Sequence, residues 1–355
     1  MIPEIRLLSQ QLVKPHFKEP KELVSWMGAV QAQDYRMVKW ALGIRLKSAT
    51  LTTIDEAYQR GDILRTHVMR PTWHLVPAED IRWMLKLSSQ RIIKACDSFA
   101  KGNGVVIPES IFTKANNLFE KVLEGNNHLT KQELEAEVVK AGILPDSPRI
   151  GYLFTRAEQE GIICSGADKD GKATYALLEE RAPAAKELHK EEALALLAKR
   201  YFTSHSPASL NDFVWWSGLP VREARQAIGA IESELNKDKF ASQELFIHQQ
   251  WNKKFRNKDV LHFMPPFDEY LISYKDRTAV MDKEHHPKAF NNFGIFYPVI
   301  LYNGRIVGNW KKVEKKSGIT FDTSFFVECP DLDKELLEKA ADRYKAFYGE
   351  RKIVE

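Results

Sequence analysis

The spacing of apolar residues predicts mostly helical structure over the first hundred positions. Apolar side chains recur every three or four positions from residue 3 to 46, as expected for a series of short amphipathic helices. Residues 63–69 and 72–76 are instead rich in β-branched and apolar residues, which predicts two strands joined by a tight connection. A long helix is expected to begin near Pro77 and to continue toward Phe99, because carboxylates follow the proline in the first helical turn.

The same order of elements is expected twice more along the chain. In the second stretch, helices are predicted at 111–123, 130–142 and 148–161, followed by strands at 162–164 and 173–177. In the third stretch, helices are predicted at 191–202, 206–217 and 220–235, followed by a hairpin within 240–251. Thr130 and Ser206 are the expected N-caps of the two middle helices. Three helices followed by a two-stranded ribbon is the order of a winged helix, so the pattern predicts three such units.

Short β-like runs replace the helical pattern after residue 255. They cover 260–264, 294–296, 298–302, 305–308 and 325–327. The dipeptide Asn303-Gly304 is a strong hairpin turn, and a final helix is expected over 332–348. The sequence therefore predicts an α+β protein, with three tandem winged-helix units on a C-terminal β-barrel-like domain. The expected domains are 1–105, 106–185, 186–250 and 251–355.

Composition and length place the chain among ordinary globular proteins. It has 355 residues, of which 44% are hydrophobic and 28% are charged, a balance typical of folded proteins. No run approaches the roughly 18 apolar residues of a membrane span, and the N-terminus lacks the apolar core of a signal peptide. The three cysteines are far apart and odd in number, which favours a reducing compartment. We therefore expect a cytoplasmic protein with no membrane contact.

Positive charge gathers in two regions that flank an acidic remainder. The net charge is +4, with +5 over residues 1–100, +6 over residues 251–320 and −7 over the rest. Such a distribution suggests a footprint for a polyanion. Solvation of the surface by lysine and arginine explains it equally well, so charge alone does not decide between the two.

Motifs for nucleotide, cofactor or metal binding are absent from the sequence. It contains no glycine-rich phosphate loop, no dinucleotide fingerprint, no cysteine pair of CxxC spacing and no HExxH motif. The cluster Glu284-His285-His286 suggests a metal ligand set, but adjacent histidines in a charged, proline-containing stretch are typical of a solvated loop. We therefore expect neither a metal nor a cofactor.

Gln31 and Gln33 form the most unusual polar pair. They lie two residues apart, just before Asp34, which is a good N-cap for the next helix. On a helix their side chains would diverge, whereas on an extended link both amides face one side. Each amide offers an acceptor and two donors, so the pair can hold a water molecule or a nucleotide edge. The alternative is that both amides simply satisfy the backbone of a loop.

Five blocks of sequence resemble one family. In chain order they are AVQAQDYRMVKWALGIRL, THVMRPTWHLVPAEDIRWML, RYFTSHSPASLNDFVWWSGLP, FMPPFDEYLISYKDR and LYNGRIVGNWK. Together they resemble the AlkZ-like winged-helix DNA glycosylases, which are related to the YcaQ group of interstrand-crosslink glycosylases. The signature of that family is Gln–apolar–Gln in the AlkZ-like branch and Gln–apolar–Asp in the YcaQ branch. Gln31-Ala32-Gln33 resembles the first, which implies a catalytic role for Gln31 and Gln33, and three winged helices on a β-barrel.

The reaction implied by this resemblance is hydrolysis of the N-glycosidic bond of N7-alkylated purines, bulky or crosslinked ones included. An N7-alkylated purine is cationic and leaves as a neutral base, so the leaving group needs no protonation. Two neutral amides can place a water molecule at the anomeric carbon by orientation rather than by strong base catalysis. The expected activity is that of a monofunctional DNA glycosylase that leaves an abasic site.

Other polar residues carry less specific signals. Candidates for contact with DNA are Arg65, His67, Arg70 and His74 on the predicted hairpin, and Lys253, Lys254 and Arg256 further on. His74 is also explained as a structural histidine, and the later basic residues as solvated surface. Asp268 and Glu269 are adjacent, which favours a structural or supporting role over an acid–base pair because adjacent side chains diverge. Tryptophans can stack on bases, although burial in a core is the default for Trp73, Trp215, Trp216 and Trp251.

Two rival functions stay open from the sequence. A non-enzymatic winged-helix DNA-binding protein, such as a regulator or a damage sensor, would share the same fold. A regulator that reads a palindrome normally carries a dimerisation element, and no coiled-coil heptads are present. A sugar-processing hydrolase built on Asp268 and Glu269 would act without DNA. We expect a monomeric enzyme whose partner is double-stranded DNA with alkylated purines, nucleoid-associated when bound.

Overall fold

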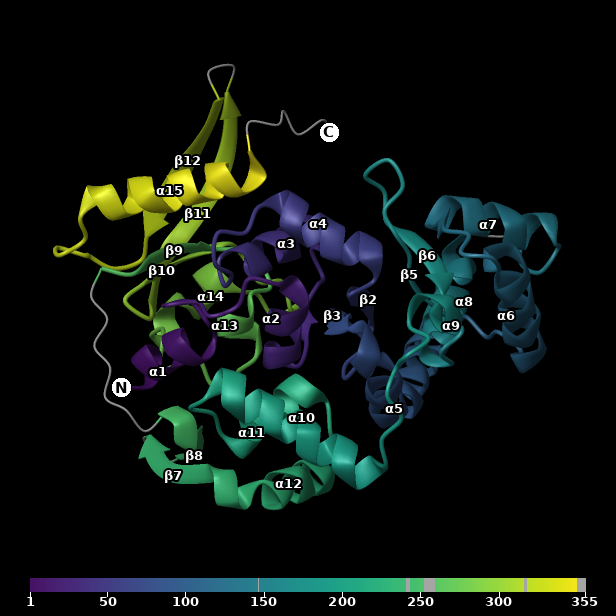
Figure 1. Ribbon diagram of the computed structural model, residues 1–355, viewed down its shortest axis with the longest axis horizontal. Coiled ribbons are helices and arrows are strands. Elements are labelled where there is room, and N and C mark those ends of the chain that lie inside the picture. The colour runs from purple at the N-terminus through teal and green to yellow at the C-terminus, as the bar shows by residue number, and fades with distance from the viewer. Residues whose placement is uncertain (146, 241–242, 252–258, 316–317, 350–355) are drawn as a thin grey trace.

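The computed structural model describes residues 1–145, 147–240, 243–251, 259–315 and 318–349. Helices and antiparallel sheets alternate in groups along the chain, which confirms the α+β class (Figure 1). Within those ranges, no helix has the length and apolar character needed to cross a membrane.

The first group packs short helices against a small sheet. Its helices are α1 (Ile2–Ser9), α2 (Pro20–Met27), α3 (Tyr35–Gly43), α4 (Leu51–Arg60) and α5 (Ile81–Gly102). Its sheet has the order β1–β3–β2, with β1 (Val30–Gln31), β3 (Trp73–Pro77) and β2 (Ile63–His67). The two strands expected here are confirmed, whereas β1 is too short for its pattern to show in the sequence. Its register pairs Gln31 with His74, so the glutamine motif begins inside a sheet rather than in a free link.

The second and third groups repeat helices followed by a hairpin. The second contains α6 (Glu109–Leu123), β4 (Leu129–Thr130), α7 (Lys131–Lys140), α8 (Ser147–Gln159), β5 (Ile163–Ser165), β6 (Thr174–Leu177) and α9 (Leu178–Arg181). The third contains α10 (Lys190–His205), α11 (Leu210–Ser217), α12 (Val221–Ala230), β7 (Leu235–Phe240) and β8 (Gln243–His248). Their hairpins are the strand pairs β5–β6 and β7–β8, and the assignment of each group as a winged helix stays a prediction.

Helix starts in these groups follow local capping chemistry. The Thr130 hydroxyl accepts a hydrogen bond from the Glu133 amide while the Glu133 carboxylate accepts one from Thr130, so the expected capping box is confirmed. The expected cap at Ser206 is wrong, because Ser209 forms the capping box of α11 with Asp212. The Ser206 hydroxyl instead donates to the carbonyl of Phe202 in α10, so it is already engaged by the preceding helix.

The C-terminal group is an open sheet crossed by a helix. Its elements are β9 (Leu261–Met264), α13 (Glu269–Ile272), α14 (His286–Ala289), β10 (Val299–Tyr302), β11 (Arg305–Lys315), β12 (Gly318–Phe325) and α15 (Lys334–Tyr348). The strand expected at 294–296 forms only an isolated bridge, between Phe290 and Phe296. The last strand lies at 318–325 rather than 325–327, and Asn303 and Gly304 make the expected turn with φ values of 48° and 83°.

The expected β-barrel is not found among the described residues. The sheet order is β12–β11–β10–β9, and the two edge strands do not pair with each other. A barrel closes only when its edges meet, whereas here α15 covers the sheet (Figure 1). The Tyr344 ring of that helix lies 5.5 Å from Trp310 of β11 and 5.3 Å from Phe321 of β12. Helix packing therefore buries the apolar face that closure would otherwise bury.

Three hydrophobic cores hold these groups together. The first draws its buried residues from 7–75 and 261–348, so it joins the two ends of the chain. The second combines residues 29–87 with 164–274, and the third lies within 112–163. The predicted domain boundaries stay predictions, but the glutamine motif lies where the first two cores meet, because Ala29 belongs to one and Val30 to the other.

A buried ion pair joins the two ends of the chain at this point. Both oxygens of the Asp268 carboxylate accept hydrogen bonds from Arg45, at 2.7 and 2.8 Å. The exposed fractions of the two side chains are 1% for Arg45 and 3% for Asp268. The two terminal nitrogens of Arg45 also donate to the Ala41 carbonyl and to the side-chain oxygen of Gln10. Such a pair holds a unique arrangement, since removing one member leaves a buried charge without its partner.

Replacing Asp268 by alanine is therefore expected to lower the free energy of unfolding by ~3–5 kcal/mol, the usual cost of breaking a buried ion pair. Urea denaturation measures this change. Asp342→Ala is the matched control, because that carboxylate pairs with Lys345 on the exposed face of α15 and should contribute little. Equal losses in both variants would contradict the structural role of Asp268.

Candidate functional site

The glutamine motif runs from the end of β1 into the start of α3. Gln31 is 4% exposed and pairs with His74 of β3, whereas Gln33 lies beyond the strand and is exposed. The amide nitrogen of Trp73 lies 3.5 Å from the side-chain oxygen of Gln33. The Asp34 carboxylate then accepts two backbone amides of the first turn of α3, so the expected N-cap is confirmed. The motif is thus fixed at both ends by secondary structure.

Three side chains from outside the motif hold its backbone and one of its amides. The Gln31 backbone amide donates to the Glu269 carboxylate at 2.5 Å. Arg70 donates to the side-chain oxygen of Gln31 at 3.0 Å, and Arg65 donates to the carbonyl of Ala32 at 3.0 Å. The rotamer of Gln31 and the peptide plane between Ala32 and Gln33 are therefore both set by charged groups, which make stronger hydrogen bonds than neutral ones.

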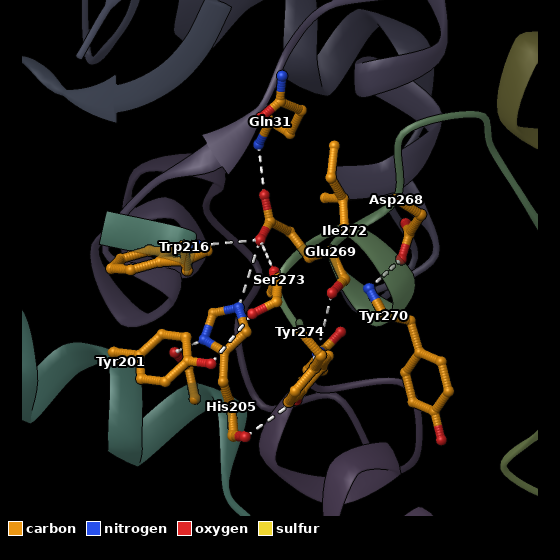
Figure 2. Close-up of polar contacts among 12 residues, drawn as sticks. Gln31, Tyr201, His205, Trp216, Asp268, Glu269, Tyr270, Ile272, Ser273 and Tyr274 are labelled. Carbon is orange, nitrogen blue, oxygen red and sulfur yellow. Dashed lines mark hydrogen bonds and ion pairs between the residues drawn. The ribbon is translucent and has the colours of Figure 1, made fainter. Parts of the chain in front are cut away.

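Glu269 lies beneath Gln31 and is saturated with donors. Figure 2 shows its carboxylate directed at Gln31, with Trp216, Ser273 and His205 around it. The indole of Trp216 donates to Oε2 at 3.2 Å, the Ser273 hydroxyl donates to the same oxygen, and His205 Nε2 lies 3.4 Å away. Burial raises the pKa of this carboxyl, but these contacts outweigh it and lower the pKa to about 2. Glu269 is therefore ionised at neutral pH.

Arg70 also brings a positive charge close to Glu269. Burial lowers the pKa of His205, while the contact with Glu269 acts in the opposite direction. Burial also lowers the pKa of Arg70, but the Glu269 charge favours the protonated guanidinium. Arg70 and Glu269 therefore carry opposite charges, and Arg70 bonds the side chain of Gln31 while Glu269 bonds its backbone amide.

Asp268 and Glu269 point in different directions despite their adjacency (Figure 2). The Asp268 carboxylate faces Arg45 and caps α13 through the Tyr270 amide at 2.8 Å. The Glu269 carboxylate faces Gln31. The two carboxylates have separate partners and do not form an acid–base pair, so the geometry does not support a sugar hydrolase built on them.

Of the hairpin residues proposed for DNA contact, His74 is buried, whereas Arg65, His67 and Arg70 are half-buried. His67 Nδ1 is 2.5 Å from the Glu158 carboxylate, and its ring centroid is 3.9 Å from that of Trp73. The Arg65 guanidinium lies 4.0 Å from the same indole centroid, so it packs as well as bonding the motif. His74 is fully buried, and its Nδ1–H donates to the Thr72 carbonyl at 2.9 Å. This environment favours the structural alternative for His74.

The remaining sequence candidates are distributed between core and surface. Lys253, Lys254 and Arg256 lie outside the described residues. Trp216 is buried and bonds Glu269, and Trp251 donates to the Thr203 carbonyl at 2.7 Å. Trp215 is half-buried beside Arg70. Across the described ranges, no group of three or more His, Cys, Asp or Glu side chains is placed to hold a metal ion.

A basic hollow of about 860 Å³ has Asp34, the residue that follows Gln33, in its wall. Its wall begins with Asp34 and Tyr35, and five cationic side chains line it. These are Arg36, Lys39, Lys288, Lys311 and Lys312. The aromatic rings of Tyr297, Trp310 and Tyr344 are also part of the lining. None of these five cations was a candidate in the sequence by position, although Lys288, Lys311 and Lys312 fall within residues 251–320, where the net charge is +6.

Comparison with known proteins identifies the family to which this chain belongs, and that family is a class of DNA glycosylases. A family model described as "DNA glycosylase AlkZ-like" matches residues 24–347, nearly the whole chain. The chain belongs to this family of DNA glycosylases.

Two comparisons with individual proteins agree with this assignment. The chain is 22% identical over 332 residues to an interstrand DNA cross-link repair glycosylase of Streptomyces sahachiroi, covering 88% of each chain. The fold is similar to that of the solved Streptomyces sahachiroi DNA glycosylase AlkZ, with a TM-score of 0.81 and 19% identity. That superposition covers 98% of this chain and 95% of the other.

Buried histidines make the stability of the chain sensitive to mild acid. Burial and the nearby Arg70 lower the pKa of His74 to about 3, and burial with Arg343 lowers that of His262 to about 3. Below a pH of about 6.5, the unfolded chain binds a proton at each ring and the folded chain does not. The contribution of these two histidines to the free energy of unfolding is therefore at its maximum above that pH, and it decreases as the pH is lowered toward 3.

Replacing His262 by glutamine is expected to reduce the slope of unfolding free energy against pH, between pH 5 and 6, by ~1.4 kcal/mol per pH unit. Urea denaturation at several pH values measures that slope. His74→Gln should reduce it by the same amount, and at pH 8 neither variant should show a pH dependence different from wild type. Unchanged slopes in both variants would mean that the folded protein protonates these rings.

Proposed function

We propose that the chain is a monofunctional DNA glycosylase that hydrolyses the N-glycosidic bond of N7-alkylated purines, with Gln31 and Gln33 positioning the water nucleophile. The observation that carries this proposal is the preorganised motif, which is followed directly by Asp34 in the wall of a basic hollow. Preorganisation matters because an amide is too weak a base to act by proton abstraction, so its contribution depends on placement.

The two amides have different tasks in this proposal. Arg70 occupies one lone pair of the Gln31 side-chain oxygen, which fixes that amide in one orientation. Gln33 is exposed and has a single long contact, with the Trp73 amide, so its oxygen is the better acceptor for a water proton. Gln31 then orients the same water or the sugar, and Gln33 receives the hydrogen bond that aligns the attack.

The charges around the motif suit a reaction that develops a cation. The sugar gains oxocarbenium-like charge as the base departs, and the ionised Glu269 lies directly behind the Gln31 peptide. Arg65 and Arg70 act on the motif in this scheme rather than as primary phosphate contacts. Phosphates are assigned instead to the cations of the hollow, Arg36, Lys288, Lys311 and Lys312.

Bulky and crosslinked lesions are included in the proposed substrate class. The relative from Streptomyces sahachiroi is named as an interstrand DNA cross-link repair glycosylase. The hollow beside the motif, at about 860 Å³, is large enough for more than a purine base. A monomeric enzyme acting on double-stranded DNA is the form we propose.

Gln31→Ala and Gln33→Ala are each expected to slow base release by ~100-fold or more, because water positioning contributes on that scale. The measurement is release of N7-methylguanine and of a bulky N7 adduct from a duplex, followed by alkaline cleavage of the abasic site. Gln59→Ala is the control, since Gln59 is an exposed glutamine on α4 outside the motif.

Loss of activity in both motif variants, with DNA binding and folding retained, supports the assignment. No release by wild-type protein from either duplex, with DNA binding intact, would overturn it in favour of a non-enzymatic DNA-binding protein. Full activity in both variants would place the water elsewhere.

A further inference from the structure

The most exposed large apolar side chain among the described residues is Phe293, at 91%. It lies in the loop between α14 and β10, next to Ile295, which is 44% exposed. A phenyl ring held in water is unfavourable by the free energy of its apolar surface. Such a side chain at a loop tip calls for a partner that covers it.

Hydrogen bonds give this loop one defined shape. The side-chain oxygen of Asn291 accepts from the amides of Phe293 and Ile295 at 2.9 and 3.1 Å. The Asn291 amide donates to the Ile295 carbonyl at 3.0 Å, and Gly294 takes the φ of +80° that the reversal requires. The tip therefore presents Phe293 from a closed, stapled turn.

The base of the loop is anchored to the active-site cluster. The rings of Phe290 and Phe296 stack with their centroids 5.1 Å apart, and the Arg277 guanidinium lies 4.8 and 5.1 Å from them. The guanidinium groups of Arg277 and Arg70 each lie 5.7 Å from the centroid of the Trp215 ring. Arg70 in turn bonds Gln31. A continuous set of contacts thus connects the catalytic motif to the loop.

Three cationic side chains lie over one indole ring near the base of the loop. Lys275, like Arg70 and Arg277, lies over the Trp215 ring, at 4.6 Å. Among the described residues, no carboxylate forms an ion pair with any of the three. The residues that flank the loop, Lys288 and Tyr297, line the basic hollow next to Gln33. An apolar tip beside a cationic hollow fits a DNA duplex, whose stacked bases lie between phosphates.

We propose that Phe293 is a wedge that inserts between base pairs beside the lesion and opens the stack toward Gln31 and Gln33. This inference rests on the proposed function and names one residue that positions its substrate. Apolar side chains inserted at a base step unstack it and kink the duplex. Unstacking exposes the anomeric carbon of the damaged nucleotide to the water that the two amides hold. The cations of the basic hollow hold the phosphates beside the step.

The test compares Phe293→Ala, Phe293→Leu and the control Phe99→Ala, which removes another exposed phenyl ring, at the end of α5. One measurement is single-turnover release of N7-methylguanine. The other is the fluorescence of 2-aminopurine placed next to the lesion, which rises when the base unstacks. Both are measured with DNA-saturated protein, so that weaker binding does not enter.

Phe293→Ala is expected to abolish the fluorescence rise and to slow release by about 10-fold or more, because the unstacking then has no apolar compensation. Phe293→Leu should retain most of both signals, since leucine can also serve as a wedge. Phe99→Ala should behave as wild type, and all variants should keep the wild-type melting temperature.

Wild-type fluorescence and release in Phe293→Ala would overturn the wedge and leave the proposed function intact. If the wild-type protein releases no base but raises the fluorescence, and Phe293→Ala does not raise it, the glycosylase function is overturned and the wedge is kept. Dependence on Phe293 for release without a change in fluorescence would contradict insertion into the base stack.

Discussion

The hydrogen bond from the Gln31 backbone amide to the buried Glu269 carboxylate is the contact on which the rest of the site depends. A carboxylate in the interior is stable only when its oxygens are satisfied. Here the donors are Gln31, Trp216 and Ser273, with the charge of Arg70 nearby. Because one of these donors is the peptide of the motif itself, the requirement to satisfy the carboxylate also fixes where the motif lies.

This constraint joins parts of the chain that are far apart in sequence. Glu269 opens α13 in the C-terminal group, while Gln31 belongs to the first sheet. Two further contacts reinforce the same junction: the Arg45–Asp268 ion pair and the hydrogen bond from the Trp40 indole to the Phe263 carbonyl at 2.7 Å. The first core, built from both ends of the chain, surrounds them. The N-terminal helices therefore hold the motif in place only when the C-terminal sheet has packed against them.

The sequence predicted the features that depend on near neighbours and missed those that depend on distant ones. The Asp34 cap, the Thr130 capping box and the Asn303-Gly304 turn involve residues within a few positions, and all are present. Ser206 and Ser209 are both plausible caps, and only the engagement of Ser206 by α10 decides between them.

The candidate site shows the same limit. Asp268 and Glu269 look equivalent in the sequence, yet one bonds Arg45 and the other Gln31, over more than two hundred positions. The β-barrel expectation failed for a related reason, since strand patterns do not reveal whether a helix such as α15 covers the sheet. The role of Arg70 also depends on a contact across 39 positions that no local pattern contains.

The separation of the buried charge of Glu269 from the exposed amide of Gln33 sets the chemistry that we propose for this site. Glu269, with a pKa of about 2, has no proton to donate at neutral pH, and its oxygens accept hydrogen bonds from Gln31, Trp216 and Ser273. The exposed member of the motif, Gln33, is neutral and cannot deprotonate water. An arrangement that neither protonates the base nor generates hydroxide can act only where the glycosidic bond is already weak. A purine with a positive charge at N7 meets that condition, and an undamaged purine does not. Because the amides are too weak to cleave the bond of an undamaged purine, normal DNA is protected from hydrolysis by this site.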